Sequence, residues 1–355
     1  MTMMQQFNLS GVALPHNAAS MLDEICEHFV EHSNVERTGD LALLTSEIGQ
    51  AAIRMHAGRL LIELTCPTEE ALQLSCNNIA EHLFYFAGEE PFELTWSTPA
   101  APARLPDLRE VTVVSAADVT PHMRRVIVAC DDVAPFVDGG MHVRILVPPR
   151  GRAPVWPTLL PDGRTSWPAG EDELVVRVYT IRAVDIARRE LWIDFLQHPA
   201  PGVMTPGADF ARDARPGDKL ALLGPGGGGL PQATSILLAG DEAALPAIAR
   251  IAAEVPANTR ISAIIEVADA MEEQPLVSAG RLDVRWLHRS TYPVASGRIF
   301  RDAVKDAIAA MDQETYAWVA CEKEDMRSIR ALLKQRGHDR KRMYAAWYWE
   351  KEPSS

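Results

Sequence analysis

Residues 109 to 224 carry a series of short β-like runs, and this series limits the fold more than any other feature of the chain. Proline and glycine separate the runs and keep each one at the length of a strand. Six such strands in succession are typical of a closed antiparallel barrel. We predict the strands at Glu110–Ser115, Arg124–Ala129, His142–Val147, Leu174–Ile181, Arg189–Phe195 and Lys219–Leu223. The stretch 148–168, PPRGRAPVWPTLLPDGRTSWP, is too rich in proline for a central strand, so we expect a long barrel loop there.

After the glycine run Gly226–Gly229 the pattern changes, and strands begin to alternate with helices. Alternating strands and helices indicate a parallel sheet that is covered on both faces. The glycine run lacks the Lys-Ser/Thr that follows in a phosphate-binding P-loop, so we interpret it as a flexible interdomain connection. We predict strands at Ser235–Ala239, Arg260–Glu266, Val284–His288 and Thr315–Ala320, and helices at Leu245–Glu254, Gly297–Ala309 and Lys323–Gln335.

The first 100 residues form a separate, acidic block. They hold three basic residues against fourteen acidic ones, whereas the remaining 255 residues are nearly neutral. The Pro/Ala-rich stretch STPAAPARLP at 97–106 is typical of a linker and ends the block. Helical and strand-like spacings both occur here, which favours a small α+β domain. We predict helices at Ala18–His32 and Thr68–Phe86, and strands at Leu41–Thr45, Gln50–His56, Arg59–Thr65 and Phe92–Trp96.

Composition excludes several classes of protein. A chain of 355 residues suggests two or three domains, and its 47% hydrophobic and 23% charged residues are those of a globular protein. The net charge of −13 argues against nucleic acid as a partner. The chain has neither an apolar run of membrane-spanning length nor a signal-peptide pattern, so we expect a cytoplasmic protein without a membrane partner. Its five cysteines contain no C-x-x-C pair, so we expect no protein metal site, and redox chemistry would need an organic cofactor or a bound substrate.

The segment Arg177–Arg182, RVYTIR, carries the most chemical information. Alternation along a strand can direct a guanidinium at a pyrophosphate, an aromatic ring at a flat heterocycle and a hydroxyl at the edge of that ring. Taken alone, the six residues are more typical of an ordinary amphipathic strand. The order of the domains, barrel first and parallel sheet second, favours the functional interpretation.

Several separated motifs resemble the siderophore-interacting protein family, the ferric-siderophore reductases of the ferredoxin–NADP reductase superfamily. The resemblance covers roughly residues 107–350. It rests on VTPHMRRVIV at 119–128, R-x-Y-T-x-R at 177–182, H-x-x-x-G-x-x-T at 198–205, P-G-D at 216–218, L-G-P at 223–225, A-G-D-E-x-A-L-P-A-I at 239–248, W-x-A-x-E at 318–322 and Y-W at 348–349. The first block resembles an uncharacterised small domain that is sometimes fused ahead of this family.

The resemblance implies that the barrel binds FAD. Arg177 would hold the pyrophosphate, Tyr179 would stack on the isoalloxazine and Thr180 would hydrogen-bond near N5 or O4. The segment 202–205 would wrap the pyrophosphate with its backbone N–H groups, because glycine allows a close approach. The implied FAD-binding residues are Arg177, Val178, Tyr179, Thr180, Arg182, His198, Gly202, Val203, Met204 and Thr205.

The resemblance also implies a nicotinamide site in the last domain. The turn after the first parallel strand would approach both FAD and NADPH or NADH, which makes Asp241, Glu242, Ala244 and Leu245 candidates. Asp241 could equally serve as a helix cap. At the C-terminus, Tyr348 or Trp349 would lie beside the flavin, although burial of a terminal strand would explain the same aromatic residues.

Three positions depart from the family pattern. Gly207 stands where the family usually has tryptophan, Cys321 replaces a common glycine, and Glu350 precedes Lys351 where basic residues usually follow the Y-W pair. The first departure concerns the adenine end of FAD. The second could narrow the nicotinamide pocket, and the third weakens the expectation of the family's cationic siderophore site.

The expected organisation is therefore a multidomain α+β protein: a small α+β domain at 1–98, a six-stranded antiparallel FAD-binding barrel at 107–230 and a parallel-sheet α/β NAD(P)H-binding domain at 231–355. The expected function is reduction of a ferric siderophore or other ferric chelate by NAD(P)H through FAD, with no side-chain acid or base. Two alternatives remain: a flavin-containing reductase for another acceptor (a quinone, free flavin or a protein), and a siderophore carrier without enzymatic activity. The siderophore, the choice between NADPH and NADH, the oligomeric state and the role of the first domain stay open.

Overall fold

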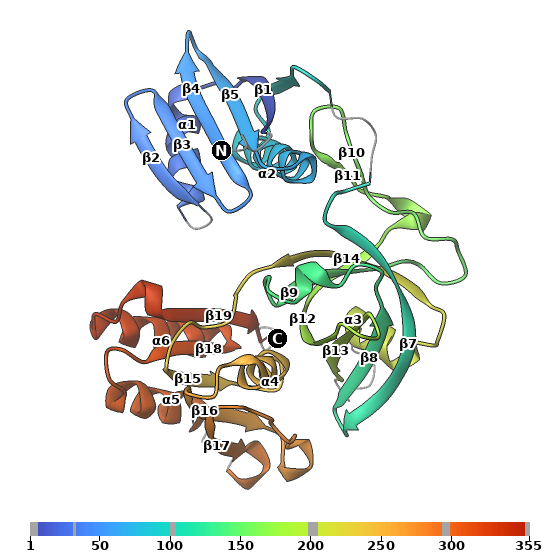
Figure 1. The fold of residues 1–355 in the computed structure, drawn as a ribbon, viewed down its shortest axis with the longest axis vertical. Coiled ribbons are helices and arrows are strands. Elements are labelled where there is room, and N and C mark those ends of the chain that lie inside the picture. Colours follow the sequence, from blue (N-terminus) through green and yellow to red (C-terminus); the bar gives the residue numbers. More distant parts are fainter. Residues whose placement is uncertain (1–5, 31–32, 100–103, 198–204, 293–298, 352–355) are drawn as a thin grey trace, which may run out of the picture. The chain divides into compact units, whose positions relative to one another are not determined.

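The computed structural model of this chain describes residues 6–30, 33–99, 104–197, 205–292 and 299–351. The chain divides into two compact units, which Figure 1 displays together and which are described here one at a time. Unit 1 comprises residues 1–108 and 151–173. Unit 2 comprises residues 109–150 and 174–355.

Unit 1 contains a six-stranded sheet with two helices packed on one face. The alternation in Arg59–Cys66 explains the layering, because Leu60, Ile62 and Leu64 are buried while Glu63 on the opposite face is exposed. The strand order is β2-β3-β4-β5-β1-β6, and all neighbouring pairs are antiparallel. The elements are β1 Phe7–Leu14, α1 Ala18–Phe29, β2 Asn34–Thr38, β3 Leu41–Ser46, β4 Gly49–His56, β5 Arg59–Cys66, α2 Glu69–Ala87 and β6 Glu93–Trp96.

Side-chain caps set the starts of both helices of unit 1. Asn17 accepts hydrogen bonds from the backbone N–H groups of Ala19 and Ser20 at the start of α1. Thr68 accepts one from Ala71 at the start of α2, whose first turn carries two glutamates. The small α+β domain is confirmed, and β1 and β2 are additions that the sequence did not predict.

A short hairpin, β10 Thr158–Leu159 with β11 Thr165–Ser166, also belongs to unit 1. It lies in the proline-rich stretch that we expected to be a barrel loop. The stretch does connect two barrel strands, but residues 151–173 pack with the N-terminal sheet and helices. The exact domain boundaries at 1–98, 107–230 and 231–355 remain predictions.

Unit 2 begins with the closed six-stranded barrel, in the order β12-β13-β8-β7-β14-β9, which confirms the predicted class. Inward-facing residues such as Val126, Ile145 and Ile193 alternate with outward-facing ones and fill the barrel. Helix α3, Pro206–Asp213, also contributes to this core through Phe210, and it was not predicted. The strands are β7 Leu108–Thr120, β8 Met123–Ala129, β9 His142–Val147, β12 Val175–Asp185, β13 Glu190–Leu196 and β14 Lys219–Gly226.

The rest of unit 2 is a five-stranded parallel sheet in the order β17-β16-β15-β18-β19, as expected from the alternating pattern. On β15, Ile236 and Leu238 face α4, while Leu237 and Ala239 face α5 and α6, so both faces are covered. The elements are β15 Ser235–Gly240, α4 Leu245–Glu254, β16 Arg260–Val267, β17 Arg281–His288, α5 Ile299–Ala310, β18 Tyr316–Glu322, α6 Lys323–Gln335 and β19 Met343–Trp349.

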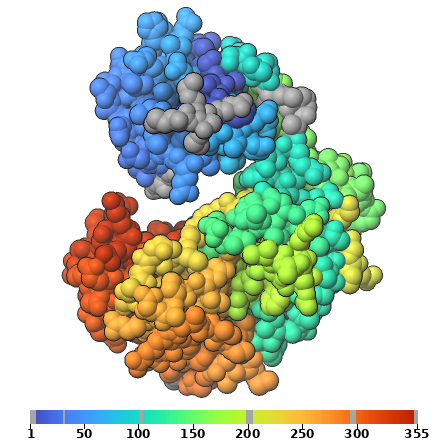
Figure 2. Space-filling view, viewed as in Figure 1, coloured from blue at the N-terminus to red at the C-terminus, as the bar shows by residue number. Residues whose placement is uncertain are grey.

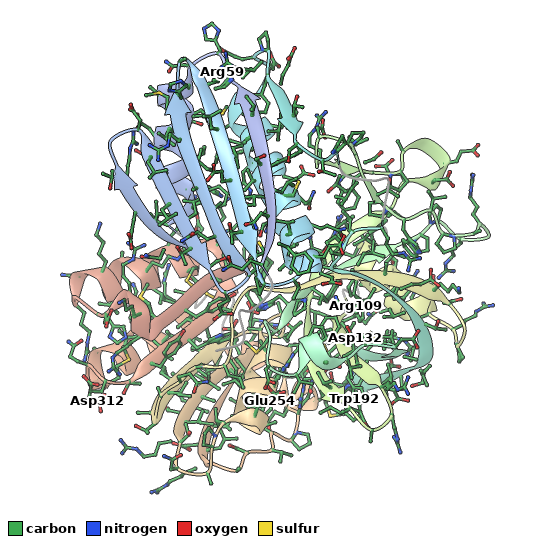
Figure 3. The ribbon with its side chains drawn as sticks, turned by 45° about the horizontal axis from the view of Figure 1, so that its top comes forward. Arg59, Arg109, Asp132, Trp192, Glu254 and Asp312 are labelled. Atoms are coloured by element: carbon green, nitrogen blue, oxygen red, sulfur yellow. The ribbon has the colours of Figure 1, made fainter. Side chains whose placement is uncertain are left out.

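Barrel and parallel sheet are packed directly on each other, and the green and cyan atoms of the barrel meet the yellow and orange atoms of the sheet domain in Figure 2. At this junction Arg250 of α4 is 1% exposed and donates hydrogen bonds to the carbonyls of Phe136 (2.6 Å) and Ile181 (3.1 Å) in the barrel. Glu254, labelled in Figure 3, accepts a third hydrogen bond at 3.0 Å. A buried guanidinium with three acceptors therefore joins the two domains of unit 2.

The glycine run between the two domains makes close contacts, contrary to our expectation of a flexible connection. The backbone N–H of Met141 donates to the carbonyls of Gly227 and Gly228, each at 3.2 Å. A Cβ on Gly140 would approach the Gly226 carbonyl oxygen to 2.6 Å. Position 140 therefore needs glycine, because the backbone of the run packs on it.

Candidate functional site

Strand β12 carries the predicted flavin-binding residues Arg177–Arg182. It pairs with β9, so that Val178 lies opposite Arg144 and Thr180 opposite His142. Val178 is 65% exposed, and the exposed Arg177 guanidinium donates only to the carbonyl of its neighbour Val176 among the described residues, at 2.8 Å. A guanidinium with donors to spare beside open apolar surface fits the pyrophosphate and ring edge of FAD.

Tyr179 lies one residue further and is held by its surroundings. Its ring is 4.3 Å from that of Phe195 between centroids, and burial raises the pKa of its hydroxyl to about 12. Helix α3 approaches it so closely that a Cβ on Gly207 would lie 2.1 Å from the Tyr179 hydroxyl oxygen. The departure from the family pattern at position 207 therefore has a physical reason, because this tyrosine position leaves no room for a side chain there.

The other predicted FAD residues are spread along the barrel. Thr180 is buried, and Arg182 lies near Asp194 and Arg125, where burial lowers the pKa of its guanidinium. Arg182 is five residues from Arg177 along the strand, roughly 16 Å, so one phosphate cannot contact both. Their roles toward FAD remain predictions.

Part of the predicted pyrophosphate loop lies outside the described residues, namely His198, Gly202, Val203 and Met204. Thr205 is described, and it forms the N-cap position of α3. Its backbone N–H donates to a carboxylate oxygen of Asp209 at 3.1 Å. That contact lies at the start of the helix. The Thr205 side chain itself makes no capping hydrogen bond.

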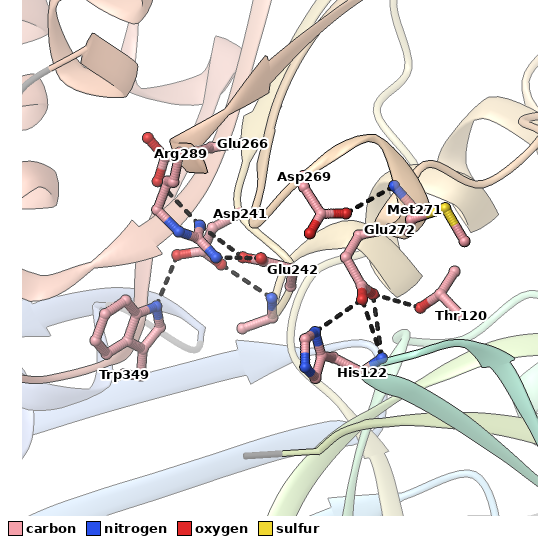
Figure 4. A network of polar contacts seen from close by, with 11 residues as sticks. Thr120, His122, Asp241, Glu242, Glu266, Asp269, Met271, Glu272, Arg289 and Trp349 are labelled. Carbon is pink, nitrogen blue, oxygen red and sulfur yellow. Dashed lines mark hydrogen bonds and ion pairs between the residues drawn. The ribbon is translucent and has the colours of Figure 1, made fainter. Parts of the chain in front are cut away.

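Asp241, in the turn after β15, links this turn to the C-terminal strand (Figure 4). One carboxylate oxygen accepts from the Ala243 N–H at 3.0 Å, as expected for a cap, and the other accepts from Trp349 Nε1 at 2.7 Å. Burial raises the pKa of Asp241 to about 6. The two interpretations of Asp241, cap and site residue, are therefore compatible, and Trp349 is anchored at the predicted nicotinamide turn.

Glu242 points to a cluster that the sequence analysis missed. Arg289, directly after β17, donates to Glu242 at 2.9 Å and to Glu266 at 3.2 Å, and a second, shorter bond also joins it to Glu242 (Figure 4). Burial raises the pKa of Glu266. All three residues follow or end parallel strands, and this shared position at the carboxyl edge is the signal that could have found them. Ala244 and Leu245 are buried in the core and start α4.

A second buried carboxylate joins the barrel to the sheet domain, and Figure 4 shows it to the right of the Asp241 cluster. Glu272 is 2% exposed and accepts from the Thr120 hydroxyl at 2.5 Å and from the His122 backbone N–H at 3.1 Å. His122 Nδ1 also lies 2.8 Å from it. Thr120 and His122 fall within the family motif at 119–128, for which the sequence suggested no role.

The C-terminal strand reaches the barrel through Tyr348. Burial lowers the pKa of His142, and the neutral ring accepts from the Tyr348 hydroxyl at 2.6 Å while its Nδ1 lies 3.2 Å from the Gly227 carbonyl oxygen. Trp349 next to it is 38% exposed. Neighbouring residues of β19 thus contact the two domains separately: Tyr348 contacts the barrel, and Trp349 contacts the turn after β15.

Three segments of the chain match known protein families. Residues 112–229 match the siderophore-interacting FAD-binding domain, residues 233–352 match the siderophore-interacting protein model, and residues 11–97 match an uncharacterised protein conserved in bacteria. A solved siderophore utilization protein from T. fusca is 31% identical with a TM-score of 0.55, over 70% of this chain and 94% of that one. The chain belongs to the siderophore-interacting protein family. The barrel is accordingly its FAD-binding domain, whereas contact of the sheet domain with NAD(P)H stays a prediction.

Two curated relatives extend the comparison of this siderophore-interacting protein. The ferric vibriobactin reductase ViuB of Vibrio cholerae is 28% identical over 239 residues, covering 66% of this chain and 86% of the relative. The NADPH-dependent ferric-chelate reductase of Escherichia coli is 26% identical over 263 residues, covering 71% and 98%.

The described part of this family member lacks two other features. Its side chains there include no group of three or more histidine, cysteine, aspartate or glutamate residues that could hold a metal ion. Among the helices that the structure describes, none combines the length and apolar character that a bilayer span needs.

The contact between Gly207 and Tyr179 gives a first test. Gly207→Ala must displace the Tyr179 ring, because overpacking of this kind costs about 1–3 kcal/mol. We expect FAD binding, measured by quenching of flavin fluorescence, to weaken about tenfold. Gly229→Ala is the control, since a Cβ there meets nothing within 4 Å. Adding Tyr179→Phe should restore part of the loss, and wild-type affinity in Gly207→Ala would contradict the role of this contact.

The raised pKa of Asp241 gives a second test. Its folded pKa of about 6 exceeds the unfolded value near 4, so the folded state holds the proton more tightly and loses stability as pH rises between those values. We expect the free energy of unfolding of the wild type to fall by on the order of 2–3 kcal/mol relative to Asp241→Asn between pH 4 and pH 7. Urea unfolding across this range measures it. Asp306→Asn, an exposed carboxylate, should parallel the wild type, and a parallel curve for Asp241→Asn would refute the assignment.

Proposed function

We propose that the protein is an FAD-dependent reductase that uses NAD(P)H to reduce Fe(III) in a siderophore or another chelate. The observation that carries this proposal is the arrangement in unit 2, where one C-terminal strand contacts the FAD barrel through Tyr348 and the nicotinamide turn through Trp349. The names of the two curated relatives, a ferric vibriobactin reductase and a ferric-chelate reductase, support the same reaction class.

The overall reaction balances without a side-chain acid or base. One NAD(P)H and two Fe(III) chelates give NAD(P)⁺, a proton and two Fe(II), and iron is substrate throughout. FAD, when bound, supplies the conversion of a two-electron hydride donor into one-electron transfers. The chain's own task is to hold donor, cofactor and acceptor in reach of one another.

Residues of β12 and the turn after β15 divide that task. Arg177 holds the pyrophosphate with the donors that it does not use within the protein, and Tyr179 supports the isoalloxazine with a ring that Phe195 and α3 fix in place. Asp241 is a positioning residue, because it orients the Trp349 ring through one hydrogen bond.

Arg144 would attract an anionic ferric chelate. It is exposed on β9 directly opposite Val178, and the described residues offer it neither a hydrogen bond nor an ion pair. A free guanidinium beside the open flavin strand favours carboxylate-bearing chelates electrostatically. This charge is independent of the residues after the Y-W pair, where Lys323 pairs with Glu350 at 2.7 Å.

Anaerobic stopped-flow absorbance tests the proposed function. Purified protein loaded with FAD is mixed with NADPH or NADH, and then with a ferric hydroxamate and an Fe(II) trap. We expect the flavin bands to bleach and then to recover as Fe(II) appears, with the faster donor identifying the physiological nucleotide. Reduced flavin that ferric chelates leave unoxidised, but that a quinone or free flavin reoxidises, would reassign the acceptor. Failure to bind FAD would overturn the proposal.

Charge reversal at Arg144 tests the substrate class. Arg144→Glu should lower kcat/KM for ferric citrate about five- to tenfold at low salt, because the change of two charges at an exposed site alters a Coulomb energy of about 1 kcal/mol. The effect should shrink in 0.5 M salt and be absent for a ferric trihydroxamate of no net charge. Arg188→Glu, on the β12–β13 turn, is the matched control. Equal losses for charged and uncharged chelates would exclude this role.

A further inference from the structure

The connection between β9 and β12 is anchored in the N-terminal domain. It leaves the barrel after Arg150 and returns at Leu174, immediately before the strand that carries Arg177 and Tyr179, yet residues 151–173 belong to unit 1. A hairpin loop of the flavin-binding barrel is therefore built into another compact unit.

Four polar contacts hold the hairpin β10–β11 on α2 and β6. Asn77 of α2 donates to the Gly163 carbonyl at 2.8 Å and to the Thr165 hydroxyl at 3.2 Å. The Thr165 N–H donates to Glu81 at 2.6 Å, and Trp96 Nε1 donates to the Asp162 carbonyl at 2.9 Å. Because Trp96 is 3% exposed and Asn77 and Glu81 lie on one helix, these contacts form a specific seat rather than a chance surface encounter.

The tip of the hairpin fits this seat only because it is glycine. Gly163 has a φ of +89°, and a Cβ there would lie 3.0 Å from Cys76 Sγ and 3.2 Å from both Ala80 Cβ and Trp96 Nε1. Beside it the Arg164 guanidinium covers the Phe84 ring, 3.8 Å from its centroid. Gly170 on the same connection also has positive φ, at +64°, but a Cβ there meets nothing within 4 Å.

The two arms of the connection are also tied to each other. Arg152 on the outgoing arm contacts Glu171 at 2.6 Å and Asp172 at 3.0 Å on the returning arm. The returning arm then runs directly into Val175, the first residue of β12. Anchoring the hairpin therefore restrains the start of the flavin strand through a few residues of chain.

We propose that the N-terminal domain is an anchor for FAD binding: it seats the β9–β12 connection and so keeps strand β12 ordered for the cofactor. A long free connection has more conformations to lose than one fixed near its middle. Order that is provided in advance lowers the entropic cost of binding. Because linkage is reciprocal, bound FAD in turn stabilises the seated hairpin. The proposal rests on FAD binding by the barrel and adds a function for the uncharacterised domain.

Two matched valine variants of the full chain test the anchor. Gly163→Val wedges the hairpin off its seat, whereas Gly170→Val imposes the same kind of backbone strain in open space. Trypsin cleavage after Arg152 and Arg164, followed by mass spectrometry, reports the seating, and titration of flavin fluorescence reports FAD affinity. We expect Gly163→Val to be cleaved at least tenfold faster than Gly170→Val and its FAD dissociation constant to rise about fivefold. FAD should slow cleavage of the wild type.

The outcomes separate the anchor from the cofactor assignment. Faster cleavage with unchanged FAD affinity overturns the coupling, and equal cleavage of both variants overturns the seat. If Gly163→Val does not fold, Asn77→Ala, which removes the two hydrogen bonds from α2, is measured in its place with the same expected directions. A wild type that binds no FAD overturns the cofactor assignment first, whereas wild-type binding with unaffected variants overturns the anchor alone.

Discussion

A buried cation, the Arg250 guanidinium, ties the barrel to the sheet domain. Arg250 comes from the sheet domain, but two of its three acceptors are backbone carbonyls of the barrel. Burying a guanidinium costs several kcal/mol unless its hydrogen bonds are satisfied, so any shift between the domains that breaks them is strongly opposed. One of those carbonyls belongs to Ile181 of the flavin strand, and α4 begins at the nicotinamide turn. The interaction thus ties the strand that carries the predicted FAD residues to the helix that follows the predicted nicotinamide turn.

Local sequence pattern predicted those elements whose packing repeats with a regular period. The bounds of β9, α4 and α6 agree with the prediction to the residue, because their apolar spacing ends where their burial ends. The elements missed lack such a period. Strand β2, NVERT, is a polar edge strand, and Gly11 interrupts the pattern of β1 because a Cβ there would lie 2.6 Å from the Trp96 ring. Each strand of the hairpin β10–β11 has only two residues, which is too short for a period, and the hairpin is held by its contacts with α2.

The sequence predicted those parts of the candidate site that lie within one short motif, and it missed contacts between distant residues. R-x-Y-T-x-R identified β12, where Arg177 is exposed and Tyr179 packs on Phe195, and their roles toward flavin stay predictions. The Asp241–Trp349 bond joins residues 108 apart, and the Arg289 cluster forms where three strands end together. Contacts of this range follow from strand order, which short motifs do not encode. The close contact between Gly207 and Tyr179 likewise could not be predicted from the sequence, because it depends on where the fold places the two backbones.

The seat of the β9–β12 connection has a consequence for how the chain is made. The chain passes between its two units three times, at 108/109, 150/151 and 173/174. Trp96 completes the N-terminal sheet, yet its partner Asp162 follows 66 residues later, after the first three barrel strands. During synthesis from the N-terminus, the Trp96 indole therefore lacks its hydrogen-bond partner until three of the six barrel strands have been made. The two units are therefore not independent segments of chain, and residues 1–108 transferred to another protein would lack the hairpin that packs on α2 and Trp96.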